Sequence, residues 1–358
     1  MTMRHPSPPG SSPAVSILTF NVWFGLEERG LLRMKPVEAD ERRERRYQVL
    51  VAELRRLGPD IIGIQEANPI PQYSRRLARD LGYDETHQVY NGGIKVGPLG
   101  IPINLRMGLI ILAKKSLHLR RVGATQISGD PFGIYGDFWC FHFTDSRHIM
   151  AGVASVGEKP LYIAHTHTYP GLPESRELLD ILDKQRGRGR ISEREYETHL
   201  STIQCSVHRQ KKEIQRILAF LETLSPVGPL ILLGDFNMTE ENPLMIHLLK
   251  EGKLWDTYRL ANPEKDGITW DSENNQNTRY SEIPTSARRD LKTTYDRLRV
   301  EYDRESRRID YIFVNSAFSR DQILESRVVL DQTLGGVHAS DHYGVLTVLS
   351  LRPERVHR

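Results

Sequence analysis

Polar residues end or interrupt six apolar runs of this sequence, and their types could do chemistry. The run LILLG at 230–234 leads directly into Asp235 and Asn237. Residues two apart in an extended chain point to the same side, so both groups should face one place. Five other apolar runs carry comparable residues at or near an end. The full set is Asn21, Glu66, His165, His167, Asp235, Asn237, Asp310, Asp341 and His342.

These side chains are carboxylates, amides and imidazoles, with almost no lysine or arginine among them. A single Asn or Asp at a strand end is usually a turn residue, and a lone His is more often structural than catalytic. Turn formation does not explain such uniform chemistry at six ends. Oxygen ligands of this kind are what a hard divalent cation requires, whereas zinc favours more His and Cys. The sequence therefore predicts a Mg²⁺ site, with Mn²⁺ as a substitute.

The elements that must position these residues follow from apolar periodicity. Short runs rich in Ile and Val, bounded by turn residues, predict strands at 16–20, 60–65, 108–113, 149–156, 161–167, 230–234, 309–314 and 343–351. Apolar residues at helical spacing predict helices at 40–57, 73–82 and 243–250, and one helix contained within 193–224. The helices are too few to connect an all-parallel sheet. We therefore expect an α/β fold of two packed sheets with helices outside.

Length and composition describe an ordinary soluble globular chain. The 358 residues carry a formal net charge of +3, and the two basic clusters are interleaved with acids. We expect one domain over 14–352, with insertions near 170–195 and 262–307, a disordered arm at 1–13 and a tail at 353–358.

Redox and membrane signals are few. The two cysteines, Cys140 and Cys205, suggest no disulfide framework, and no apolar run has signal-peptide or membrane-spanning length. We therefore expect a cytoplasmic protein with no transmembrane segment.

Five motifs in order carry a family resemblance. LTFNVWFG, DIIGIQEA, LLGDFNM, RRIDYIFVN and ASDHYGVL resemble the motif series of the endonuclease/exonuclease/phosphatase (deoxyribonuclease I-like) superfamily. The resemblance covers about residues 15–350. It implies a four-layer sandwich of two packed mixed β-sheets flanked by helices. It also implies Mg²⁺-dependent hydrolysis of a phosphoester.

The resemblance also implies roles for the metal-binding and water-activating residues. Glu66 would be the main Mg²⁺ ligand, with Asn21 and Asp341 completing or orienting the site. Asp235 would orient and activate the attacking water, and Asn237 would hold a phosphate oxygen.

Two further residues complete the catalytic set that the resemblance implies. His342 would bind phosphate or assist the leaving group, and Asp310 would orient its ring. These roles agree with chemistry, since in-line displacement needs neutralised phosphate charge, a positioned water and a protonated leaving group.

The segment YIAHTHTY bears on which phosphoester is cleaved. It resembles a stretch of the neutral sphingomyelinases, in which His165 aligns with their catalytic histidine. The segment around GDFWCF at 136–141 resembles their Gly-Asp-aromatic segment. The resemblance implies phospholipase C-type cleavage of a phospholipid head group, with peripheral membrane contact left open. His167, Trp23 and Trp139 would then contact the substrate.

Two alternatives stay open from the sequence. A nuclease or DNA-end-processing phosphodiesterase would use the same metal site, with basic residues from RGRGR at 186–190 or from 288–308 around the cleft. A non-catalytic binding member would have lost a Glu, Asp or His of the set, and none is missing.

Overall fold

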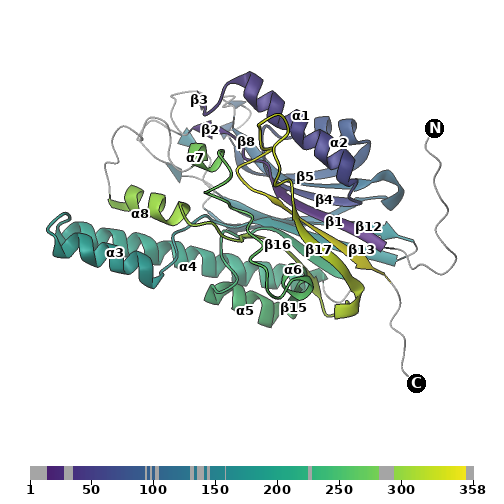
Figure 1. Ribbon diagram of the computed structural model, residues 1–358. Helices are drawn as coiled ribbons and strands as arrows, with labels where there is room; N and C mark the ends of the chain where they lie inside the picture. The colour runs from purple at the N-terminus through teal and green to yellow at the C-terminus, as the bar shows by residue number, and fades with distance from the viewer. Residues whose placement is uncertain are drawn as a thin grey trace.

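Two six-stranded mixed sheets pack face to face, and helices cover both outer faces (Figure 1). The computed structural model describes residues 14–27, 35–92, 95–96, 99–100, 105–129, 133–134, 141–142, 146–157, 159–224, 228–281 and 294–351. The predicted four-layer sandwich is confirmed. The arm expected at 1–13 and the tail expected at 353–358 lie outside the described residues.

The first sheet has the strand order β17-β18-β1-β4-β8-β5. Its strands, in chain order, are β1 (Ala14–Asn21), β4 (Ile61–Ala67), β5 (Tyr83–Gly92), β8 (Arg106–Lys114), β17 (Ile323–Val329) and β18 (Gly344–Ser350). β1 runs parallel to β4 and antiparallel to β18.

The second sheet has the order β15-β16-β14-β13-β12-β9. Its strands are β9 (Arg120–Ser128), β12 (Arg147–Val156), β13 (Lys159–His167), β14 (Leu230–Asp235), β15 (Leu254–Asp256) and β16 (Asp310–Asn315). β13 and β14 are parallel, and β16 is antiparallel to β14. Short two-residue strands form three further pairs: β2 (Leu26–Glu27) with β3 (Lys35–Pro36), β6 (Lys95–Val96) with β7 (Leu99–Gly100), and β10 (Gly133–Ile134) with β11 (Phe141–His142).

Helices bury apolar stripes on each outer face. The helices are α1 (Asp40–Leu57), α2 (Gln72–Leu81), α3 (Arg176–Gly187), α4 (Glu193–Leu224), α5 (Pro243–Gly252), α6 (Thr257–Ala261), α7 (Thr278–Ser281) and α8 (Thr294–Asp303), with 3-10 turns at Lys115–Leu117 and Arg320–Gln322. α1 and α2 pack on the first sheet, and α4 and α5 pack on the second. Between the sheets, aliphatic residues such as Ile17, Ile111, Ile163 and Ile231 form the central layer of the core.

The structure confirms the predicted helices. Capping residues mark where α1 ends and where α5 begins, in addition to the apolar periodicity. α1 ends where Gly58 adopts a left-handed φ of 58° and donates to the Leu54 carbonyl. Asn242 caps α5, with its side chain accepting from the Leu244 N–H, and Pro243 follows at the first helical position.

The two insertions form structure of their own. The segment expected as a surface excursion near 170–195 contains α3, and the segment near 262–307 contains α7 and α8. Leu178 and Leu182 of α3 pack with Ile203 of α4 and Leu298 of α8 in a separate apolar cluster. No helix in the described part of the chain is both long and apolar enough to cross a bilayer.

Candidate active site

Strand direction brings the predicted residues to one edge of the sandwich. β1, β4, β13 and β14 end at this edge, while the antiparallel strands β16 and β18 begin there. Cross-sheet contacts then join the two halves, for example from Asn21 Nδ2 to Asp235 Oδ2 at 3.0 Å. The predicted residues that meet at this edge are Asn21, Glu66, His167, Asp235, Asn237, Asp310, Asp341 and His342.

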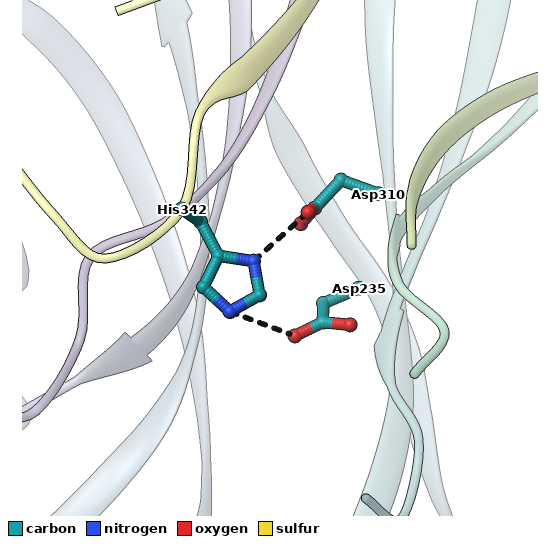
Figure 2. A group of neighbouring side chains, drawn as sticks. All are labelled: Asp235, Asp310 and His342. Carbon is teal, nitrogen blue, oxygen red and sulfur yellow. Dashed lines mark hydrogen bonds and ion pairs between the residues drawn. The ribbon is translucent and has the colours of Figure 1, made fainter. Parts of the chain in front are cut away.

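His342 lies between two buried carboxylates (Figure 2). Its Nδ1 is 2.9 Å from Asp310 Oδ2, and its Nε2 is 3.8 Å from Asp235 Oδ2. Burial would lower the pKa of His342, but the Asp310 and Asp235 carboxylates outweigh it and raise that pKa. The ring is therefore an imidazolium at neutral pH. With a neutral ring in place of the imidazolium, the same cluster could hold a cation, because ligand atoms of the three residues lie within 4.8 Å of one another.

Asp235 is the point on which the site converges. Its Oδ1 accepts from the Asn237 N–H at 2.9 Å, and its Oδ2 accepts from Asn21. His167 Nε2 lies 3.5 Å from the same Oδ2. Burial and the neighbouring Asp310 carboxylate raise the pKa of Asp235. Its Oδ2 atom thus faces nitrogen groups from three separate strand ends.

His167 is a neutral ring with a defined tautomer. Tyr90 Oη lies 3.0 Å and Arg147 Nη1 lies 3.1 Å from Nδ1. Arg147 Nη1 is also 3.3 Å from Nε2, so the guanidinium alone does not fix the tautomer. The carboxylates of Asp235 and Glu66 face Nε2 and can only accept, which favours the proton on Nε2. Burial, and then the Arg147 charge, hold the pKa of His167 well below its usual range. The Nε2–H is left to face Asp235 and, at 3.9 Å, Glu66.

Glu66 lies in a β-bulge with a left-handed φ of 59°. Such a conformation is costly for a non-glycine residue and occurs where the chain must aim a side chain. Trp23 and Asn237 have similar values, so three of the six described non-glycine residues with positive φ belong to this edge.

The carboxylates of Glu66 and Asp341 fit a hard divalent cation. Burial, and then the Asp341 charge, raise the pKa of Glu66. The Phe24 N–H donates to Glu66 Oε2 at 3.2 Å, and Ser340 Oγ donates to Asp341 Oδ1 at 3.0 Å. The two carboxylates repel each other, Asp341 is buried and Glu66 is partly buried. Beside the Asn21 amide they form an oxygen-rich donor set that a cation would stabilise.

His165 lies deeper than the other predicted residues. It is fully buried between the sheets, and its Nε2 is 2.6 Å from Gln65 Nε2. Burial lowers the pKa of His165 to about 3, so the ring is neutral. A Cβ on Gly63 would approach His165 Nε2 to 3.3 Å and Leu233 Cδ1 to 2.1 Å, so the glycine makes room for this packing. His167, two residues further along β13, is the histidine that contacts the Asp235 carboxylate.

Of the two tryptophans predicted to contact substrate, the structure describes only Trp23. Trp23 is 5% exposed, with the Arg46 guanidinium 4.5 Å above its ring, and it lines a cavity of about 790 Å³ that also includes Glu66. Trp139 lies outside the described residues.

Three residues at this site were missed from the sequence. Tyr90 and Arg147 contact His167, and the Trp270 ring packs edge-on against His342 at 5.2 Å. Arg147 starts β12, which is antiparallel to β13, so a cation just before the apolar run at 149–156 was a usable signal. Trp270 stands alone in a polar insertion, where no periodicity marks it.

The fold and this carboxylate–histidine site define the class of metal-dependent phosphoric ester hydrolases. The chain belongs to the Endonuclease/Exonuclease/phosphatase family, whose model matches residues 18–342. No curated protein matches the chain significantly.

Solved structures support the fold. An endonuclease/exonuclease/phosphatase from Bacteroides vulgatus has a TM-score of 0.55 and 14% identity, covering 95% of this chain and 99% of that chain. A D. rerio TDP2 structure complexed with single strand DNA product has a TM-score of 0.52 and 14% identity, covering 94% and 98%. An endonuclease/exonuclease/phosphatase from Beutenbergia cavernae has a TM-score of 0.52 and 19% identity, covering 95% and 72%.

Proposed function

We propose that this protein is a Mg²⁺-dependent phosphodiesterase that cleaves a phospholipid head group by in-line attack of water. The observation that carries the hydrolysis is the convergence on Asp235 Oδ2 of Asn21, His167 and His342, beside the Glu66–Asp341 carboxylate pair. Glu66 and Asp341 would hold the cation, and Asn21 would orient the site. When bound, the cation would neutralise charge on the phosphate oxygens.

The protein side chains divide the remaining work. Asp235 orients the attacking water and accepts its proton as the new oxygen–phosphorus bond forms. His342, held by Asp310, delivers a proton to the leaving oxygen as its bond to phosphorus breaks. The Nε2–H of His167 donates to a phosphate oxygen, a role that we assign to His167 and not to His165. Asn237 binds a phosphate oxygen with its amide.

The lipid proposal rests on the sphingomyelinase-like stretch that ends β13, which supplies His167. It predicts peripheral contact with a membrane surface, where such substrates lie. A second candidate, processing of DNA ends, is favoured by the fold of D. rerio TDP2, which was solved with a single strand DNA product. Both substrates are phosphodiesters, so they place the same demand on the site.

A substrate panel tests the proposal. The full chain is assayed with Mg²⁺, and with EDTA as control, on phospholipids in mixed micelles, on single-stranded and duplex DNA, and on bis-p-nitrophenyl phosphate. Metal-dependent release of a phosphorylated head group supports the proposal. Cleavage of DNA with no turnover of any phospholipid would replace it with the DNA-end candidate.

A further inference from the structure

A cavity of about 810 Å³ lies beside the candidate active site, and both insertions contribute to its wall. One part of the wall is the segment that begins with Thr239, two residues after Asn237. Another part is the end of the second insertion, at residues 305–307, together with the following Arg308. There Arg307 pairs through its backbone with Trp270, which in turn pairs with His342. The cavity and the reacting centre therefore share structural neighbours.

The charges on the cavity wall are mostly negative. Five carboxylates line it without forming an ion pair with any described residue: Glu174, Glu177, Glu241, Asp266 and Glu305. Its two guanidiniums are already paired. Arg307 binds Asp303 at 2.9 Å, and Arg308 binds Asp256 at 2.7 Å and Glu240 at 2.5 Å. The wall thus offers unpaired negative charge and little positive charge.

A buried acceptor on the same wall is unsatisfied. Gln210 is 1% exposed, and its Nε2 donates to the Tyr169 carbonyl at 3.0 Å, which fixes the orientation of the amide. Its Oε1 has no hydrogen-bond partner. An unsatisfied buried acceptor is costly, and a ligand that brings an N–H donor would remove that cost.

Aromatic packing around the cavity argues against a quaternary ammonium group. Sites for such groups use free aromatic faces. Tyr302 is the single aromatic residue among the described lining residues, and Arg307 already lies 3.9 Å from its ring centroid. A group that binds here must therefore rely on ionic contacts and N–H donation.

We infer that this cavity binds a primary ammonium group, and that this group belongs to the head group of the substrate. The inference rests on the proposed phosphodiesterase function and narrows it to an aminoethyl-type head group rather than a choline-type one. The ammonium nitrogen donates to Gln210 Oε1, and the carboxylates of the wall attract its charge. A trimethylated nitrogen cannot make the first of these contacts.

A matched pair of chromogenic diesters tests the specificity. p-Nitrophenyl phosphoethanolamine and p-nitrophenyl phosphocholine differ only in the methyl groups on nitrogen. We expect the aminoethyl ester to have a KM about tenfold lower, with similar kcat, because hydrogen bonds to charged groups are worth about that much. In Gln210→Met, which keeps the length of the side chain but removes the acceptor, this ratio should fall to about one. In the double variant Glu241→Gln and Glu305→Gln, KM should rise for both esters, because both carry the positive charge that the wall attracts. The control variant Glu222→Gln and Glu251→Gln removes two exposed carboxylates outside the cavity lining and should keep the ratio.

Binding of ethanolamine alone separates this inference from the proposed function. Saturation-transfer NMR on the full chain should detect ethanolamine with the wild type and the control variant, and lose the signal with the Glu241→Gln and Glu305→Gln double variant. Turnover of bis-p-nitrophenyl phosphate without an ethanolamine signal, or equal KM values for the two esters, would overturn the cavity inference alone. An ethanolamine signal without metal-dependent turnover of any diester would overturn the proposed function alone.

Discussion

The Asp310 carboxylate accepts a hydrogen bond from His342 Nδ1 at 2.9 Å, and this bond fixes the orientation of the ring toward Asp235 (Figure 2). Asp310 is the first residue of β16, and His342 precedes β18, so the pair joins the two sheets. A carboxylate in this position both sets the tautomer and favours the charged ring. The proton that His342 donates in the proposed reaction therefore depends on Asp310.

Replacing Asp310 should reduce the rate of the chemical step. Asp310→Asn keeps the shape of the side chain but removes the charge that favours the imidazolium. We expect kcat for the phospholipid, whose alkoxide leaving group needs a proton, to fall by about 10²- to 10⁴-fold, the usual contribution of general acid–base catalysis, with little change in KM. For bis-p-nitrophenyl phosphate, whose p-nitrophenolate leaves without a proton, the fall should be smaller. Asp183→Asn, an exposed position on α3, is the control and should keep full activity. A fall in KM and kcat by equal factors would contradict this role.

Replacing Glu66 should weaken binding of the divalent cation. Glu66→Gln keeps an oxygen but removes the negative charge that opposes Asp341. We expect Mn²⁺, used as a spectroscopic substitute in electron paramagnetic resonance, to bind at least ~10- to 100-fold more weakly, as weakening a metal site commonly does. The variant should become more stable without metal, because burial and Asp341 raise the pKa of Glu66 and so destabilise its carboxylate. Unchanged Mn²⁺ affinity would exclude Glu66 as a ligand.

The same substitution at the two histidines of β13 should affect activity differently. His167→Gln removes the Nε2–H that faces Asp235 and should lower kcat by ~10²-fold or more. His165→Gln should keep activity within a few-fold, because the new amide oxygen can still accept from Gln65. Steady-state assays of both variants decide between the two rings, and a larger loss from His165→Gln would support the catalytic role that the sequence predicts for it.

His165 should make the protein sensitive to acid. Its pKa is lowered to about 3 in the fold, against an ordinary value of 6.5, so the unfolded chain binds more protons between these values. The stability that the neutral ring contributes is therefore present above pH 6.5 and is lost as pH falls toward 3, by up to about 1.4 kcal/mol per pH unit. Urea unfolding from pH 7 to pH 4 should show a shallower decline for His165→Gln than for the wild type. Parallel curves would contradict the assignment.

The sequence predicted the centre of each sheet better than its edges. The four edge strands, β5, β9, β15 and β17, are those that the apolar runs did not reveal. In β5, for example, nine of ten residues are only partly buried, so neither a continuous apolar run nor strict alternation is required. Interior strands are covered on both faces, and their apolar runs made them visible.

The same reasoning explains which site residues were found. Asn21, Asp235 and Asp310 stand directly at the ends of buried strands, where a polar residue contrasts with its neighbours. Tyr90 reaches the site from an edge strand and Trp270 from an insertion. Neither residue differs in polarity from a flanking apolar run, so neither was recognised from the sequence. His165 and His167 share a face of β13, so only depth between the sheets distinguishes them, and depth is set by the partner sheet.

Arg46 of α1 should link the stability of the fold to the metal site. Its buried guanidinium binds Glu38 at 2.5 Å and donates to the carbonyls of Val22 at 3.1 Å and Ala339 at 2.9 Å. These carbonyls lie in the two loops that follow Asn21 and precede Asp341. Lysine cannot span all three partners, because it lacks the planar fork of arginine.

We expect Arg46→Lys to lower the free energy of unfolding by about 1–3 kcal/mol, the cost of leaving buried carbonyls unsatisfied. It should also raise the Mg²⁺ concentration needed for half-maximal activity, while kcat at saturating Mg²⁺ recovers, because bound cation stabilises the folded loops. Arg56→Lys, in the exposed last turn of α1 and outside the cavity that Trp23 and Glu66 line, is the control and should change neither quantity. Urea unfolding and Mg²⁺ titration of activity measure the two effects. Loss of stability with an unchanged Mg²⁺ requirement would show that Arg46 supports the helix packing alone, since the loops would then hold Asn21 and Asp341 without it.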